Sequence, residues 1–321
     1  MDGMVDFLFI TGTYRSSTTL TSRIFNAHPD IQIYSDLTVY SRFHELDNSD
    51  FHRKEEEISA RILARRNERL SVRNNSTHEN SVGHWKSILN RLDSRNTKPI
   101  VGEKVVLEWQ NIPLILSDRF SVAIHTIRDP RSVLVSWKKM TNSPKPRYLD
   151  ALANCLNSML YGLLYREEYS SNRYVQFVYD DYIKAPEEYL TNIQNVLGLE
   201  LDLNCLDPGN WTLDGKSYKS SSMHGTIKSN KQAQTRNWSD YITPIEEWIF
   251  NEYFPDWILE TYSFEAKRGL PKLDKDSQNE LEVILNDPFV SESLNSLKNT
   301  GLRRFPSDFR DPKTWMRPFF E

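Results

Sequence analysis

The stretch "FITGTYRSSTTLTSRIF", residues 9–25, joins an apolar run to a segment of helical character through a glycine. Val5–Thr11 is short and apolar, which predicts a buried parallel strand. Thr18–Ala27 predicts a helix that ends before Pro29, because the residue preceding a proline disfavours helical backbone. A strand, a turn at Gly12 and a helix N-terminus with unpaired N–H groups are typical of a phosphate-binding loop. A plain strand-turn-helix connection is the alternative for this stretch alone.

The loop lacks two residues of the common ATP-binding motif. That motif reads Gly-x4-Gly-Lys-Ser/Thr, in which the lysine reaches the terminal phosphates and the hydroxyl holds magnesium. Counted from Gly12, its last three positions are Ser17, Thr18 and Thr19. A magnesium-dependent kinase or ATPase is therefore disfavoured, and a small-molecule kinase with a degenerate loop is kept as an alternative.

Composition is that of an ordinary globular chain. Its 321 residues are 38% hydrophobic and 26% charged, with a formal net charge of −4. We therefore expect no nucleic-acid partner, and any anion site must be a local cluster of cations. Cys155 and Cys205 give neither a disulfide framework nor a metal-ligand spacing. The sequence has no apolar run that could span a membrane and no signal-peptide pattern, which predicts a cytoplasmic protein.

Strands and helices alternate along the first two thirds of the chain. After Val5–Thr11 and Thr18–Ala27, the expected strands are Ile31–Tyr34, Ile100–Lys104, Ser121–Ile127 and Tyr174–Val178. The further expected helices are Pro130–Met140 with Asp129 as N-cap, Ala151–Tyr169, Pro186–Leu197 with Gly198 as C-cap, and Thr243–Phe254 as the last clear helix. This alternation predicts an α/β fold with a central parallel sheet flanked by helices.

The remaining segments are expected to belong to the same single domain, residues 1–321. Residues 38–98 are highly charged and predict a helical insertion, either a solvated hairpin or a cap over an acceptor site. The pattern loosens after Leu199, so we expect a loop and helix segment, residues 200–321, that closes over the site.

Four notable residues fall at the carboxyl ends of expected strands: Gly12, Lys104, Arg128 and Tyr179. Ligands of parallel sheets lie beyond those ends. In "AIHTIRDPRSVLVSW", Arg128 can make paired hydrogen bonds to a phosphate, and Ser136 can reach the same group from two turns along the helix. An arginine that satisfies sheet-end carbonyls is the alternative for Arg128.

Together these motifs resemble those of the sulfotransferase family, in its bacterial and Golgi-type branch, which uses 3′-phosphoadenosine-5′-phosphosulfate (PAPS). "TYRSSTTL" resembles the loop for the 5′-phosphosulfate, and "IRDPRSVLVSW" the element for the 3′-phosphate; "NAHPDI" and "FVYDDYIKAP" also fit. The resemblance covers roughly residues 5–36 and 100–200. It implies a P-loop-like sulfotransferase core, PAPS as cofactor, and a hydroxyl acceptor on a glycan, peptide or small metabolite. It also implies no metal requirement, because fixed arginine and lysine can take the place of magnesium.

The resemblance further implies a set of cofactor-binding residues. These are Thr13, Tyr14, Arg15, Ser16, Ser17, Thr18, Thr19, Arg128, Ser136, Tyr179 and Arg236, with Lys228 and Lys231 as further candidates. Arg15 would contact the bridging oxygen and the sulfuryl group, while Arg128 and Ser136 would hold the 3′-phosphate. The family's loop glycine is Ser17 here, and serine adopts positive φ less readily. A non-catalytic protein that binds PAPS is therefore another alternative.

Asp36 is the implied general base, because an acidic residue follows the "HPD" turn at a similar distance in tyrosyl-protein and glycan sulfotransferases. A turn or N-cap aspartate is the alternative, and His28 and His125 are weaker candidates for the base. Lys104 resembles a lysine of several glycan sulfotransferases that would stabilise the leaving phosphate or a sulfuryl oxygen. Since adjacent strand residues face opposite sides, we expect Lys104 and not Glu103 to face the site.

Overall fold

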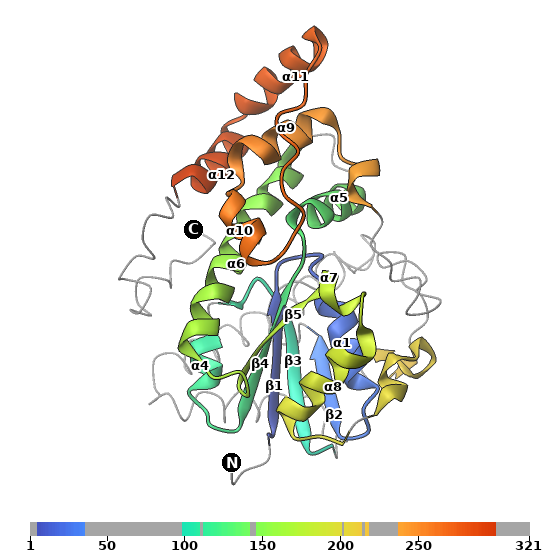
Figure 1. Cartoon of the computed structure of the whole chain (residues 1–321). Coiled ribbons are helices and arrows are strands. Elements are labelled where there is room, and N and C mark those ends of the chain that lie inside the picture. The colour runs from blue at the N-terminus through green and yellow to red at the C-terminus, as the bar shows by residue number, and fades with distance from the viewer. Residues whose placement is uncertain are drawn as a thin grey trace, which may run out of the picture. The chain divides into compact units, whose positions relative to one another are not determined.

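The computed structural model describes residues 5–35, 98–109, 112–141, 146–200, 202–213, 216–217 and 237–299. Among these residues, the main sheet contains β1 (Phe7–Gly12), β2 (Ile31–Ser35), β3 (Ile100–Val106), β4 (Ser121–Ile127) and β5 (Tyr174–Val178). The strands lie in the order β2-β3-β1-β4-β5, and every pair is parallel (Figure 1). The expected central parallel sheet is confirmed.

Up to residue 200 the four expected helices are confirmed, with bounds within one residue. The helices of the described ranges are α1 (Thr18–Asn26), α4 (Ile112–Leu116), α5 (Pro130–Thr141), α6 (Asp150–Glu168), α7 (Tyr179–Tyr182), α8 (Pro186–Leu197), α9 (Pro244–Tyr253), α10 (Asp256–Thr261), α11 (Lys275–Leu285) and α12 (Pro288–Asn299). Of these, the short helices α4 and α7 were not expected. The short strands β6 (Thr212–Leu213) and β7 (Lys216–Ser217) pair separately as an antiparallel hairpin.

The prediction that Thr243–Phe254 is the last clear helix was wrong, because α10, α11 and α12 follow it. The apolar pattern that reveals a helix is weak in α11, whose buried side chain is Leu281. Its start is marked instead by Asp274, whose Oδ1 accepts a hydrogen bond from the Ser277 N–H at 2.8 Å. An N-cap without an apolar stripe is a poor signal in a polar sequence.

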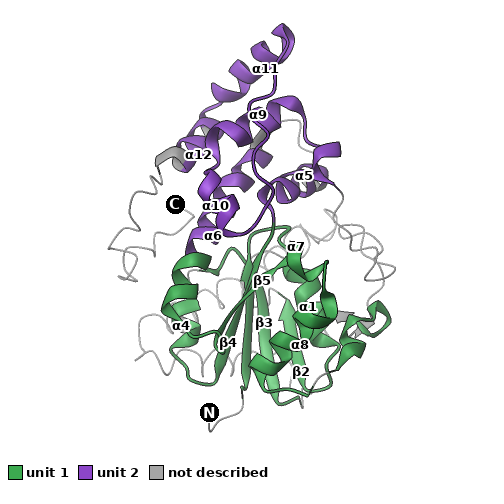
Figure 2. Ribbon diagram, in the orientation of Figure 1, with its two compact units in different colours: residues 1–128, 162–234 green, residues 129–161, 235–321 purple. Residues whose placement is uncertain are grey.

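The chain divides into two compact units (Figure 2). Unit 1 comprises residues 1–128 and 162–234 and contains the parallel sheet; unit 2 comprises residues 129–161 and 235–321 and is helical in its described part. The boundary falls directly after Arg128 and again within α6. Residues 36–97, which include nearly all of the predicted insertion, lie outside the described residues.

The main core of unit 1 lies between the sheet and two helices, α1 and α8. Leu8 and Ile10 of β1 pack there with Ile24 of α1 and Ile193 of α8, and all four are buried. On the other face α4 packs against β4, so β1 is covered on both sides and reads as a continuous apolar run (Figure 1). Each such side chain contributes about 1.5–3 kcal/mol on burial. This packing fixes the end of β1, where the phosphate-loop candidate begins.

Unit 2 holds a buried cation at the start of α5. Asp129 caps this helix as predicted, because its Oδ1 accepts the Arg131 N–H at 2.8 Å. The Arg131 guanidinium forms an ion pair with Asp129 at 2.7 Å, donates to the Glu265 carbonyl at 2.7 Å and lies 4.2 Å from the Trp238 ring centroid. Neighbouring residues of the chain therefore serve different units: Arg128 belongs to unit 1, whereas Asp129 and Arg131 stabilise unit 2.

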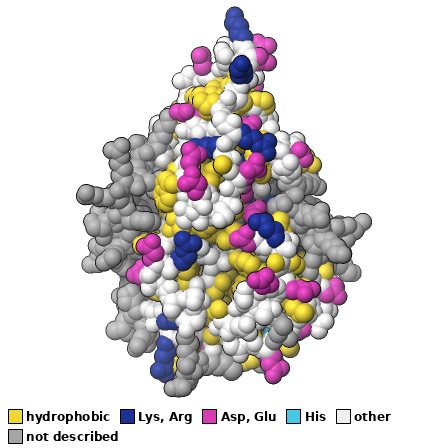
Figure 3. Space-filling view, in the orientation of Figure 1, with side chains coloured by type: hydrophobic (Ala, Val, Ile, Leu, Met, Phe, Trp, Pro, Cys, Tyr) yellow, Lys and Arg dark blue, Asp and Glu magenta, His cyan; other side chains and the backbone are white. Residues whose placement is uncertain are grey.

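The visible surface of the described residues carries both signs of charge. Lysine and arginine side chains are interspersed with aspartate and glutamate in Figure 3. This distribution differs from the basic stripe that is typical of nucleic-acid binding. Among the described helices, none has the length and hydropathy needed to cross a membrane.

Candidate anion-binding site

The loop Thr13–Ser17 connects β1 to α1 at the carboxyl ends of two neighbouring strands, β1 and β4. After β1 the chain continues to β2, at one edge of the sheet, and after β4 it continues to β5, at the opposite edge. Parallel sheets bind ligands at such a switch point. The fold therefore brings the loop and Arg128 to the same place, since Arg128 directly follows β4.

Gly12 is required by the close approach of β4. A Cβ at this position would lie 2.5 Å from the Thr126 carbonyl oxygen and 2.7 Å from the Ser16 Oγ. Real Cβ atoms essentially never come this close to other atoms. The missing side chain lets the loop turn tightly over the end of β4.

The loop backbone is left-handed at two residues that are not glycine. Arg15 has φ 65° and Ser17 has φ 82°, a region that non-glycine residues seldom adopt. Ser17 precedes α1 and makes no side-chain capping bond to it within the described residues. The first N–H groups of a helix have no intrahelical acceptor, so the start of α1 is available to an anion.

Two loop hydroxyls are used inside the protein. Ser16 Oγ lies 2.7 Å from the Thr13 carbonyl oxygen and 2.6 Å from Thr126 Oγ1. Ser17 Oγ donates to the Ser16 carbonyl. Because these hydroxyls already have partners, they contribute to the shape of the loop. Thr18 and Thr19 are the first two residues of α1, and Thr18 is buried.

Arg15 and Arg128 form a pair of neighbouring cations. Arg128 Nη1 donates to the Arg15 carbonyl at 3.1 Å, and its Cζ lies 4.6 Å from the ring centroid of Tyr179. Burial, and then repulsion from Arg128, lowers the pKa of Arg15 below its usual value. The Nε of Arg128 is buried and has no hydrogen-bond partner among the described residues. An anion at this point would relieve the repulsion and satisfy the buried donor.

Lys104 and Glu103 are both buried in β3, at 6% and 0% exposure, and the strand register places their side chains on opposite faces of the sheet. Lys104 pairs with Ile10, whose side chain packs toward α1, while Glu103 pairs with Phe9. Adjacent strand residues face opposite sides, so Lys104 lies on the α1 face. It stands two residues before the end of β3 and not at the end, because the strand continues to Val106.

The two histidines have structural partners. The Asp30 N–H donates to His28 Nδ1 at 3.1 Å, and the opposite nitrogen, Nε2, lies 3.3 Å from the Glu200 carbonyl. His125 is completely buried, with Nδ1 2.8 Å from the Tyr174 hydroxyl and its ring 6.3 Å from that of Trp109. Burial lowers the pKa of His125 to about 3. His28 precedes β2, at the amino end of the sheet, away from the loop.

For several candidates the structure gives no position relative to this site. Asp36 and Arg236, as well as Lys228 and Lys231, lie outside the described residues. Ser136 lies on α5 in unit 2 and is half-buried. Thr126, in contrast, belongs to the loop's hydrogen-bond network, although no local sequence pattern indicates it. Only the sheet order, which places Thr126 opposite Gly12, reveals this contact.

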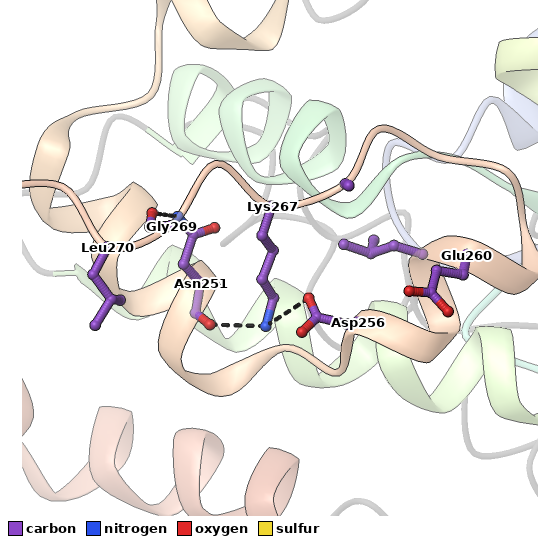
Figure 4. A pocket seen from close by; sticks show the side chains of 8 residues that line it. Asn251, Asp256, Glu260, Lys267, Gly269 and Leu270 are labelled. Carbon is purple, nitrogen blue, oxygen red and sulfur yellow. Dashed lines mark hydrogen bonds and ion pairs between the residues drawn. The ribbon is translucent and has the colours of Figure 1, made fainter.

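A pocket of about 380 Å³ lies wholly within unit 2 (Figure 4). Its lining includes Asn251, Asp256, Glu260, Lys267 and Leu270. Lys267 Nζ is 3.2 Å from Asp256 Oδ1 and donates to the Asn251 carbonyl at 2.8 Å, so its charge is already matched. None of the described residues predicted to bind an anion lines this pocket, and the chemistry of the loop makes the loop the better candidate.

Comparison with known proteins gives one family. A family model described as "Sulfotransferase family" matches residues 8–203. No curated protein sequence matches the chain. The sulfotransferase domain of the Synechococcus PCC 7002 olefin synthase is 18% identical, with 89% of this chain and 98% of that one covered and a TM-score of 0.48. The sulfotransferase domain of the curacin biosynthetic pathway is 15% identical, with 82% and 99% covered and a TM-score of 0.49. A mouse sulfotransferase in complex with PAP is 11% identical, with 94% and 91% covered and a TM-score of 0.41.

Proposed function

Because the family match extends over more than half of its length, the chain belongs to the sulfotransferase family, and we propose that it transfers a sulfuryl group from PAPS to a hydroxyl acceptor. The observation that carries the choice of PAPS is the cation pair of Arg15 and Arg128 at the start of α1. Arg128 is bonded to the Arg15 backbone carbonyl, the charge of Arg128 lowers the pKa of the Arg15 side chain, and the buried Nε of Arg128 has no partner among the described residues. Such an arrangement suits a ligand with more than one anionic group.

The described residues fit the phosphate and sulfate groups of this cofactor. Arg15 and the first N–H groups of α1 would receive the 5′-phosphosulfate, and Arg128 the 3′-phosphate. The ring face of Tyr179 packs against the Arg128 guanidinium, and this contact favours one orientation of the guanidinium. We assign Ser136 and Arg236 to the 3′-phosphate on the family pattern.

PAPS would supply the sulfuryl group, and the protein would supply position and charge. Fixed cations stabilise charge that develops on a transferred group and reduce the need for reorganisation during the reaction. Arg15 and Lys104 would take this role. Asp36 would accept the proton of the acceptor hydroxyl, a type of help that contributes about 10²–10⁴-fold in rate.

The left-handed backbone at Ser17 favours the enzyme over a protein that has lost its activity. With φ 82° and ψ 11°, the residue adopts a conformation that glycine would adopt without strain. The serine therefore occupies a backbone conformation that suits the glycine expected at this position. Strained residues of this kind cluster at functional sites, which supports an active loop.

A thermal-shift comparison tests cofactor binding. Adenosine 3′,5′-bisphosphate, which carries the cofactor's two phosphate positions, should raise Tm, since a ligand at about 100 times its Kd adds about 2.7 kcal/mol to stability. ATP with magnesium should give a much smaller shift. An equal shift with both ligands, or none with the bisphosphate, contradicts the proposal.

Transfer is tested with labelled PAPS and a panel of glycan, peptide and small-molecule hydroxyl acceptors. We expect Asp36→Asn to lower turnover by about 10²–10⁴-fold and to leave the bisphosphate Kd unchanged. Asp30→Asn is the matched control, because Asp30 is an exposed residue of the same "HPD" turn. Tight cofactor binding without transfer to any acceptor would favour a non-catalytic binding protein, and unchanged turnover in Asp36→Asn would exclude Asp36 as the base.

A further inference from the structure

We propose that Thr126 is a positioning residue for the proposed reaction: its hydroxyl holds the loop Thr13–Ser17 in the shape that presents Arg15 and the start of α1 to the cofactor. Thr126 is completely buried in β4 and stands opposite Gly12 in the β1–β4 register. It has no direct path to a ligand. This inference rests on the proposed function, because it concerns the same loop.

Two buried hydroxyls, those of Thr126 and Ser16, link β4 to the loop. Thr126 Oγ1 lies 3.2 Å from the Thr11 carbonyl and 2.6 Å from Ser16 Oγ. Ser16 Oγ in turn lies 2.7 Å from the Thr13 carbonyl. These three contacts share the protons of two buried hydroxyls. The bond between Thr126 and Ser16 therefore joins β4 to the loop, and one of the two carbonyls accepts the remaining proton.

The proton count makes both hydroxyls necessary. Each hydroxyl donates one hydrogen bond and can accept others. In one arrangement Thr126 donates to Ser16, and Ser16 donates to the Thr13 carbonyl. In the other, Ser16 donates to Thr126, and Thr126 donates to the Thr11 carbonyl. Removing the Thr126 hydroxyl breaks this link in either case and leaves Ser16 Oγ with one partner fewer.

Thr126 and Arg128 contact the loop at two consecutive places. Thr126 is the penultimate residue of β4, and Arg128 directly follows the strand. Thr126 contacts Ser16, and Arg128 donates to the carbonyl of the preceding residue, Arg15. The lack of a Cβ at Gly12 makes this approach possible.

Both contacts are made within the strained part of the loop. Arg15 and Ser17 are left-handed, and Ser16 lies between them. Strained conformations of non-glycine residues persist only when their surroundings hold them. The tether to Thr126 acts on the central residue of this run, so its loss should change the direction of the loop N–H groups and of Arg15 without any change in charge at the site.

The test compares Thr126→Val with Thr126→Ser. Valine keeps the shape of threonine without the hydroxyl, whereas serine keeps the hydroxyl. Isothermal titration with adenosine 3′,5′-bisphosphate, well below each variant's Tm, should give a Kd about 10-fold higher for Thr126→Val, as expected for one lost buried hydrogen bond. Thr126→Ser should stay within about threefold of the wild type.

Ser121→Ala is the matched control. Ser121 is a buried residue of the same strand, and its Oγ donates to Asp118 Oδ2 at 2.8 Å, at the amino end of β4. We expect its Tm to fall and its bisphosphate Kd to stay that of the wild type. Thr126→Val binding like the wild type, with a lower Tm alone, would show that Thr126 only fills the core.

A second variant keeps the test decisive if Thr126→Val folds poorly. Ser16→Ala removes the other end of the same hydrogen bond and should raise the Kd by a similar factor, and the double variant should bind no worse than the weaker single one. Additive losses would overturn the proposal. If the wild type does not bind the bisphosphate, both the proposed function and the positioning role of Thr126 are wrong. If the wild type binds and both single variants bind equally well, only the positioning role of Thr126 is wrong.

Discussion

Ser17 has the backbone of a glycine while keeping a side chain. Its φ of 82° places it in the left-handed region, where a residue with a Cβ is less stable by about 1–2 kcal/mol. Its hydroxyl donates to the Ser16 carbonyl, a local bond that offsets part of this strain. The sequence predicted the difficulty correctly, since Ser17 stands where the family has glycine, but it could not decide whether the loop would keep its shape.

Substitutions at Ser17 should order by their tolerance of positive φ. We expect Ser17→Gly to be as stable as the wild type or up to about 1 kcal/mol more stable, because the gain in the folded state is reduced by the greater freedom of glycine in the unfolded chain. Ser17→Val should be the least stable, since a β-branched residue tolerates this region poorly. Urea denaturation of the three proteins measures the order. A glycine variant less stable than the valine variant would contradict a left-handed Ser17.

At the scale of elements, the strand-loop-helix unit could be read from the sequence and its neighbours could not. β1 and α1 were predicted within two residues, because an apolar run followed by a glycine and a helical pattern is a local signal. The role of Thr126 depends on β4 lying beside β1, which is a property of sheet order. Lys104 could be assigned to a face by alternation, but its position relative to the strand end depends on where β3 stops.

The start of α5 gives a prediction at the same scale. The Arg131 guanidinium is 1% exposed and is held by Asp129, the Glu265 carbonyl and the Trp238 ring. Removing one partner of a buried ion pair leaves the other charge uncompensated, which costs about 3–5 kcal/mol. We therefore expect Arg131→Ala to lower the free energy of unfolding by roughly this amount.

Arg268→Ala is the control for that measurement. Arg268 also lies over Trp238, with its Cζ 5.1 Å from the ring centroid, but its ion pair with Glu265 is exposed. Exposed pairs contribute little to stability, so the control should unfold close to the wild type in urea. Equal losses in the two variants would mean that the Trp238 contact, and not the buried pair with Asp129, stabilises unit 2.

At the scale of the whole molecule, the parallel sheet was predictable and the division into units was not. Alternating strands and helices specify a parallel sheet by local pattern. The unit boundary after Arg128 separates two residues of one motif, "RDPR", so no composition change marks it. The helices after residue 255 also escaped prediction. Among the described residues, α10 has no side-chain cap and α11 buries only Leu281, whereas α12 does carry an apolar stripe at helical spacing, Val290, Leu294 and Leu297, which the prediction missed.

The stability of the whole molecule should depend on His125 in acid. Its folded pKa is lowered to about 3 by burial, while the unfolded chain has a value near the ordinary 6.5. Below pH 6.5 the unfolded state therefore binds a proton that the folded state refuses, and stability falls as the pH falls until the folded pKa is reached. From pH 6.5 to pH 5 this loss is about 2 kcal/mol, at 1.36 kcal/mol for each pH unit.

The variant His125→Gln should remove this loss. Whatever its stability at pH 7, its free energy of unfolding should decrease less between pH 7 and pH 5 than that of the wild type. Comparing the two slopes cancels the other titrating groups, and parallel slopes in urea denaturation would mean that His125 is not held neutral by the sheet.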